Sequence, residues 1–283
     1  MVQISRVVFC CILLIAPVMA GTSMVVAPSS IAGVDVLVPG TAEFEGALTR
    51  LLGGHHFDGV RDSLPYSVIV RNRTARRIVL MAVLFEVQPT PGANLKRTLK
   101  RVGNLEAFAD AGVGIKAGGL WFVSLSNADG AVNGHDVAAY AGSRGSLAAA
   151  EMNNRLADSA SIACSLDCIL FEDGSFVGPD RGLAGKVRTY DRLMKSILGE
   201  TEILAHVSSM RGNTFEEVKA YLTHQAGQGQ SDPLDMYAQA VAGRARSMLR
   251  ALEIAGPTGQ VEMFDQSDAR LRLLKSLPKI TRQ

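Results

Sequence analysis

Residues Ser161–Phe171 read SIACSLDCILF, and the chain continues through Glu172-Asp173-Gly174 into Ser175-Phe176-Val177. The first run is apolar at most positions, as a buried strand is. Asp-Gly is a strong hairpin signal, because these residues tolerate the positive φ values that a tight turn needs. We therefore expect an antiparallel hairpin with Asp173-Gly174 at its tip, ended by Pro179.

Three segments upstream also have strand character. Tyr66–Asn72 and Ile78–Val87 are separated by the short polar stretch Arg73–Arg76, which predicts a second hairpin. Ile78–Val87 is apolar at nearly every position, so we expect it in the centre of a sandwich rather than at an exposed edge. Gly119–Ser126 contains the only tryptophan. Successive strands joined by turns or long loops predict an antiparallel β-sandwich of immunoglobulin-like shape over residues 60–182.

Residues 183–283 have the apolar spacing of amphipathic helices. From Val187 to Leu198 apolar side chains recur every three or four residues. Thr214 followed by Glu217 is a capping box, and Asp232-Pro233 is typical of a helix start. A last helix is expected over Asp265–Leu277. The expected fold class is therefore α+β, with an antiparallel β-sandwich followed by an α-helical C-terminal region.

The first twenty residues, MVQISRVVFCCILLIAPVMA, have the layout of a secretory signal peptide. Arg6 is their only charge, Val7–Val18 is an apolar core, and Val18-Met19-Ala20 is a small-residue cleavage site. The core is shorter than the ~20 apolar residues that span a bilayer, and no later apolar run is long enough. We expect residues 1–20 to be removed, residues 21–59 to form a linker and a short helix at Ala42–Leu52, and the product to be periplasmic or extracellular.

Export would permit a disulfide between Cys164 and Cys168. On a straight strand their Cα atoms would lie roughly 13 Å apart, whereas a disulfide needs less than about 7 Å. The spacing leaves two alternatives: a pair of buried free thiols, or a bridge at a bend in the chain.

The charge balance excludes one class of partner. Without Arg6, 28 basic residues stand against 27 acidic ones, a net charge of +1. A near-neutral chain has no broad basic field for nucleic acid, so we expect none as a partner. The expected partner is an envelope or extracellular protein, or a small ligand, with no membrane span after signal removal.

The most distinctive candidate site is the segment Glu172–Gly182. Glu172 and Asp173 form the turn, and Asp180 and Arg181 follow the return strand. Loops on a rigid scaffold often carry function, so these four residues are a candidate ligand or partner site. A purely structural role for the turn is the alternative interpretation.

The other sequence motifs do not indicate a metal, cofactor or catalytic site. His55-His56 and Asp58 are adjacent ligand types, but neighbouring residues on an extended segment point in opposite directions. No zinc, phosphate-loop, dinucleotide or nucleophile-elbow pattern occurs, so we expect no metal and no cofactor. Asn72-Arg73-Thr74 is formally a glycosylation acceptor.

Two segments carry a resemblance to known proteins. Tyr66–Asn72 and Phe171–Asp180, FEDGSFVGPD, resemble segments of exported bacterial proteins of uncharacterised function that have a sandwich-like domain. The resemblance implies the sandwich fold and export, and it brings no catalytic residues.

The leading functional hypothesis is an exported, non-enzymatic binding or cell-envelope interaction protein. The alternative is a secreted or periplasmic hydrolase whose site is assembled from distant residues such as Asp173, Asp180 and His206. Such sites leave no local sequence signature, so composition does not separate the two hypotheses.

Overall fold

A computed structural model describes residues 23–27, 31–52, 61–92, 98–103, 114–125, 151, 154, 156–181, 188–228 and 235–283. The expected signal peptide, the His55-His56-Asp58 group and the expected helix start at Asp232-Pro233 lie outside these residues. The elements are β1 (Ser23–Val26), β2 (Val34–Leu37), α1 (Ala42–Leu52), a 3-10 helix (Arg61–Tyr66), β3 (Ser67–Asn72), β4 (Ile78–Pro89), β5 (Thr98–Gly103), β6 (Leu120–Ser124), β7 (Ser159–Phe171), β8 (Ser175–Val177), α4 (Thr189–Ser209), α5 (Phe215–Gln228), α6 (Met236–Ala255), a 3-10 turn (Gly256–Thr258), α7 (Gly259–Ser276) and β9 (Thr281–Arg282).

The larger sheet is built around the long strand β7. β4 pairs antiparallel with one edge of β7, and β5 pairs with the other edge of β4, so β4 is an interior strand and not an exposed edge, as expected. The opposite edge of β7 is shared by two short strands. β1 lies parallel to its first half, with Ser23 opposite Ser161, and β8 lies antiparallel to its second half, with Phe176 opposite Leu170. β9 then pairs in parallel with β8.

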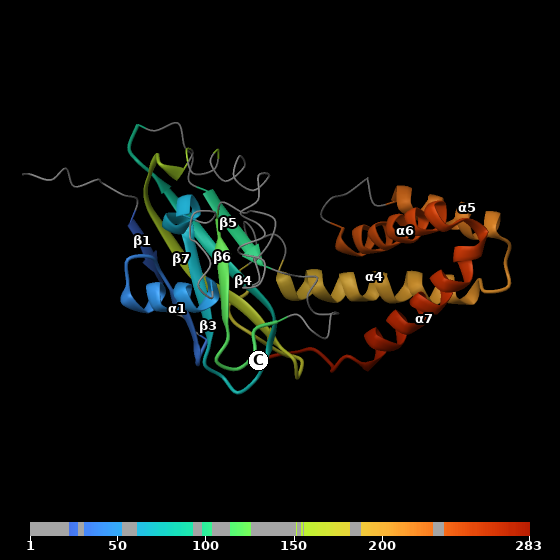
Figure 1. Cartoon of the computed structure of the whole chain (residues 1–283), viewed down its shortest axis with the longest axis horizontal. Coiled ribbons are helices and arrows are strands. Elements are labelled where there is room, and N and C mark those ends of the chain that lie inside the picture. Colours follow the sequence, from blue (N-terminus) through green and yellow to red (C-terminus); the bar gives the residue numbers. More distant parts are fainter. Residues whose placement is uncertain are drawn as a thin grey trace, which may run out of the picture.

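The smaller sheet has the strand order β2-β3-β6 and is antiparallel throughout. One of its faces shares a single hydrophobic core with the larger sheet, and its other face is covered by α1. The far face of the larger sheet packs against the first turns of α4. Figure 1 shows α1 beside the strands at one end of the molecule, with α4 leading away from them. The core residues at these interfaces include Val70, Val83, Phe85 and Val123 between the sheets, Phe44, Leu48 and Phe122 under α1, and Leu80, Leu170 and Leu193 under α4.

The helices form a second core beyond the sheets. α4 runs outward from the larger sheet and packs with α5, α6 and α7 (Figure 1). The chain then returns to the sheet, where the backbone nitrogen of Thr281 donates to the carbonyl oxygen of Gly174 at 2.9 Å. The helical region is therefore an excursion between the neighbouring parallel strands β8 and β9. None of the helices in the described part of the chain combines the length and hydropathy that a bilayer crossing needs.

The predicted antiparallel, immunoglobulin-like sandwich is wrong. The larger sheet is mixed, because β1 and β9 both pair in parallel with their neighbours, and the sheets do not form a closed antiparallel sandwich. The predicted hairpin between Tyr66–Asn72 and Ile78–Val87 is also wrong, since β3 belongs to the smaller sheet and β4 to the larger one. The Asp173-Gly174 hairpin is confirmed by the pairing of β7 with β8, and the architecture as a whole is α+β.

Candidate functional site

A β-bulge at Asp167 determines where the polar side chains of β7 point. The pairing with β4 passes from Leu166 opposite Val83 directly to Cys168 opposite Ala82, so Asp167 is the extra residue. An extra residue reverses the alternation of side chains along a strand. As a result Leu166 faces the core between the sheets, whereas Cys168 faces α4.

The same bulge separates the two cysteines. Cys164 lies in the core between the sheets and Cys168 lies on the opposite face of β7. Both are buried free thiols, so the alternative of a Cys164–Cys168 bridge has no support in the structure. Burial raises the pKa of Cys164 to about 12, because the apolar core disfavours the thiolate.

Asp180 caps α4 from outside the helix. Its Oδ1 accepts a hydrogen bond from the backbone nitrogen of Thr189 at 2.7 Å, and its Oδ2 accepts one from that of Tyr190 at 3.1 Å. Arg188, at the usual capping position, makes no side-chain cap. Asp180 also has a positive φ of 46°, a conformation that Asp tolerates better than most residues. Asp180 is therefore a buried structural residue, not a solvent-facing ligand group.

Asp167 connects the bulge to the segment that carries Asp180. Its backbone oxygen accepts from the nitrogen of Asp180 at 3.0 Å, and its Oδ1 accepts from the nitrogen of Arg181 at 2.9 Å. The Arg181 guanidinium also donates to Ser165 at 2.6 Å. We call Ser165, Asp167, Cys168, Asp180 and Thr189 the buried joint; the Arg181 side chain, which is 51% exposed, contacts it from the surface.

The buried joint also has the residue types of a metal site. Asp167, Cys168 and Asp180 each offer one ligand atom, and these atoms lie within 4.8 Å of one another. Both carboxylate oxygens of Asp180 accept backbone N–H groups, and the Cys168 thiol lies 3.4 Å from the Thr189 hydroxyl. A cation would compete with the bonds that hold α4 on the sheet, so the arrangement fits a structural joint better than a metal centre.

Glu172 and Asp173 lie at a different place from Asp180 and Arg181. Asp173 forms an ion pair with Arg76 at 3.1 Å, and Glu172 forms one with Arg77 at 3.2 Å. The backbone N–H of Ser175, with smaller help from Arg76, holds the pKa of Asp173 below its usual value. The candidate site of the sequence is thus divided between the buried joint and an exposed turn.

Asn72 organises the neighbouring turn between β3 and β4. Its side-chain amide donates to the carbonyl oxygens of Arg76, Ile115 and Lys116 at 2.7 to 3.2 Å. Its Oδ1 accepts from both the nitrogen and the hydroxyl of Thr74. Because Asn72 is fully buried, its amide is inaccessible to a glycosyl donor in the folded protein.

Two arginines share one carboxylate beside this turn. Oδ2 of Asp35 accepts from Arg71 at 2.7 Å and from Arg73 at 2.6 Å. Burial raises the pKa of Asp35, but the two guanidinium groups outweigh it and the net pKa is lowered. One negative charge therefore faces two positive charges, and the Arg73 side chain is 60% exposed.

These segments converge at one end of the sheets, which we call the turn end. Figure 1 shows the β3–β4 turn, the β7–β8 turn and the C-terminal residues close together there. Lys279 belongs to it, because its carbonyl oxygen lies against Gly174. This site was not predicted from the sequence, although four arginines in the seven residues 71–77 (RNRTARR) of a near-neutral chain were the available signal. Among the residues that the structure describes, the charged residues of the turn end are Asp35, Arg71, Arg73, Arg76, Arg77, Lys116, Glu172, Asp173 and Lys279.

The three residues of the hydrolase alternative do not meet. Asp173 lies at the turn end and Asp180 at the start of α4, whereas His206 lies in the last turn of α4, stacked on Tyr221 at 4.3 Å. At about 1.5 Å per residue, roughly 25 Å of helix separates the capped end of α4 from His206. No common catalytic site can form from them in this structure.

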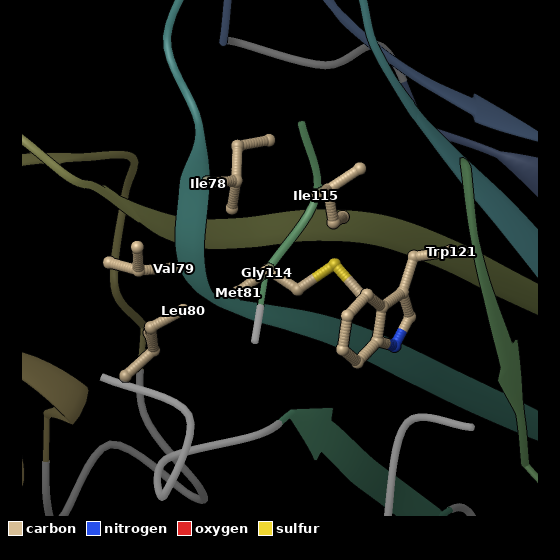
Figure 2. Close-up of a pocket in the computed structure, with 7 residues that line it drawn as sticks. All are labelled: Ile78, Val79, Leu80, Met81, Gly114, Ile115 and Trp121. Atoms are coloured by element: carbon tan, nitrogen blue, oxygen red, sulfur yellow. The ribbon is translucent and has the colours of Figure 1, made fainter. Parts of the chain in front are cut away.

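An apolar cavity lies between β4, β6 and the segment around Ile115 (Figure 2). Its walls include Ile78, Met81 and the ring of Trp121. Its volume is about 10 Å³, which is room for one water molecule at most. This cavity is a packing defect and too small for a substrate.

Comparison with known proteins adds no relative: no protein-family model, no curated protein and no solved structure matches this chain.

Proposed function

We propose that this protein is an exported, non-enzymatic binding protein of the cell envelope, and that it holds an anionic partner at the turn end. The layout of residues 1–20 supports export. The resemblance of Tyr66–Asn72 and Phe171–Asp180 to exported bacterial proteins supports it as well. The division of the acidic candidates between a buried joint and a charged surface favours binding over catalysis.

The charge of the turn end is the observation that carries the proposal. Its described residues have six basic and three acidic side chains, an excess of three positive charges, whereas the whole sequence has a net charge of +2. Concentrated charge of one sign attracts oppositely charged partners and speeds their association.

The frame under these charges is rigid. The five hydrogen bonds of the Asn72 side chain fix the β3–β4 turn, and Ile78 pairs with Ile115 on the next segment. A preorganised surface loses little conformational entropy when it binds. The backbone positions from which the arginine side chains extend are therefore fixed.

Sedimentation with isolated envelopes of the source cells tests this function. Arg73→Gln combined with Arg76→Gln should reduce the bound fraction several-fold, with a stronger effect at low salt. Arg246→Gln combined with Arg250→Gln, both exposed on α6, removes the same charge far from the turn end and should leave binding unchanged. Equal binding by the two double variants would refute a role for the turn end. Mass spectrometry of the exported form should find Gly21 at the N-terminus, and retention of residues 1–20 would refute the export proposal.

A further inference from the structure

The arginines of the turn end already bind carboxylates within the protein. Asp35, Glu172 and Asp173 each lie within 3.2 Å of a guanidinium group. Guanidinium groups match the planar geometry of carboxylates and bind them by paired, charge-assisted hydrogen bonds. The turn end is therefore already shaped to hold carboxylates.

The carboxylates of Asp173 and Asp35 leave positive charge at the turn end available to a partner. The side chains of Arg76 and Asp173 are 41% and 46% exposed, so water screens their ion pair. Asp35 is shared by Arg71 and Arg73, which leaves one guanidinium charge uncompensated. An incoming carboxylate could pair with Arg73 or displace Asp173 from Arg76 at little cost.

The side chains of the turn end favour a protein partner over a lipid surface. Binding in the interface of a bilayer needs apolar side chains that insert as well as basic charge. Among the described residues the large exposed apolar side chains are Val25 on β1, Met194 and Leu198 on α4, Ile254 on α6 and Val261 on α7. β1 pairs with the first half of β7, away from the β7–β8 turn, and the others lie on the helices. In the described part of the chain, the turn end therefore offers charge without a large exposed apolar side chain.

We propose that the turn end binds an acidic protein segment, whose carboxylates pair with Arg73 and Arg76. This inference rests on the proposed function and names the chemical class of its partner. Arg73 and Arg76 belong to one turn, so acidic side chains at alternate positions of an extended segment, which lie on the same face, would be directed toward both. Binding is electrostatic and falls as salt rises.

Fluorescence anisotropy with a labelled oligoglutamate peptide tests the inference on the protein as purified from cells. We expect saturable binding that weakens on the order of tenfold in the Arg73→Gln, Arg76→Gln double variant and is unchanged in the Arg246→Gln, Arg250→Gln control. Lys116→Gln, a second variant at an exposed position, should weaken binding to a smaller extent. Thermal denaturation of each variant shows whether it is folded.

Two outcomes overturn the inference. Binding of phosphatidylglycerol vesicles with no binding of oligoglutamate would assign the turn end to a lipid surface. Oligoglutamate binding that the double variant and the control reduce equally would show a general charge effect. In both cases the envelope sedimentation still reports independently on the proposed function, because it does not depend on the chemical class of the anion.

Discussion

Asp180 holds the first turn of α4 through Thr189: its Oδ1 accepts the backbone N–H of Thr189 at 2.7 Å, although Asp180 is nine residues upstream. The N–H groups of a helix's first turn have no partner within the helix and need an acceptor. Here the acceptor is the side chain of Asp180, which follows β8 in the chain. The backbone nitrogen of Asp180 is in turn hydrogen-bonded to Asp167, which fixes this segment to β7. One carboxylate therefore fixes where the helical excursion leaves the sheet.

Asp180→Ala should destabilise the protein by about 2 kcal/mol, because it leaves the buried N–H of Thr189 and the partly buried N–H of Tyr190 without their acceptor. Asp191→Ala, at an exposed acid in the first turn of α4, should cost roughly 0.5 kcal/mol or less. Urea denaturation of both variants measures the difference. A stability of Asp180→Ala equal to that of the parent protein would mean that the cap is dispensable and would reopen a site role for Asp180.

Asn72→Asp should destabilise the protein by at least about 3 kcal/mol, which is more than the cost of Asp180→Ala. The substitution keeps the shape of the side chain but places a carboxylate against the carbonyl oxygens of Arg76, Ile115 and Lys116. Asn213→Asp, at an exposed position between α4 and α5, should change stability by only about 0.5 kcal/mol. A chemical-denaturation difference below 1 kcal/mol between the two variants, on the order of experimental scatter, would contradict the anchoring role of Asn72.

The sequence predicted the positions of helices and strands better than it predicted which strands pair. The 3.6-residue period located α1 and the helical region, and the Thr214–Glu217 capping box is present, with the backbone nitrogen of Thr214 bonded to Glu217 at 2.8 Å. Local patterns do not encode the parallel pairings of β1 with β7 and of β9 with β8, which join segments far apart in the chain. These pairings are what make the sheet mixed.

The bulge at Asp167 explains why the candidate site was only partly predictable. With strict alternation, Cys164 and Cys168 would share a face of β7, and the bulge places them on opposite faces. The acids near the Asp-Gly turn were found from the sequence, but their division between a buried cap and a surface ion pair depends on tertiary contacts. The turn-end arginines were visible as a charge run, and only the fold joins them to Asp35.

Gly174→Ala should loosen the C-terminal strand. Gly174 has a φ of +84°, and a Cβ added there would lie 2.6 Å from the carbonyl oxygen of Lys279. Gly40 has nearly the same φ, +83°, with no atom near its Cβ position, so Gly40→Ala isolates the cost of the backbone conformation, about 1 kcal/mol. We expect Gly174→Ala to cost more than this and to speed amide exchange at Thr281. Equal costs with unchanged exchange would show that β9 adapts without loss.

Two glycines on facing helices should respond in opposite directions to alanine. A Cβ at Gly199 on α4 would lie 2.7 Å from the carbonyl oxygen of Tyr237 on α6, so Gly199→Ala should push the helices apart and cost about 1–3 kcal/mol. Gly243 on α6 has open space at its Cβ position, so Gly243→Ala should stabilise by about 0.5–1 kcal/mol through helix propensity. Thermal melting of both variants checks the signs. A rise in melting temperature for Gly199→Ala would show that α4 and α6 are not in close contact.

Cys164 should make the protein less stable at alkaline pH. Its pKa rises from the ordinary 9.0 to about 12 in the folded protein, so above pH 9 the unfolded chain loses a proton that the folded protein keeps. The free energy of unfolding then falls as pH rises, by at most about 1.4 kcal/mol per pH unit, until the folded thiol itself titrates. Cys164→Ala removes this contribution while it costs packing at every pH. The stability difference between the parent protein and Cys164→Ala should therefore shrink by about 1 kcal/mol from pH 8 to pH 10, measured by urea denaturation. A difference that stays constant over this range would mean that the Cys164 thiol reaches solvent and titrates normally in the folded state.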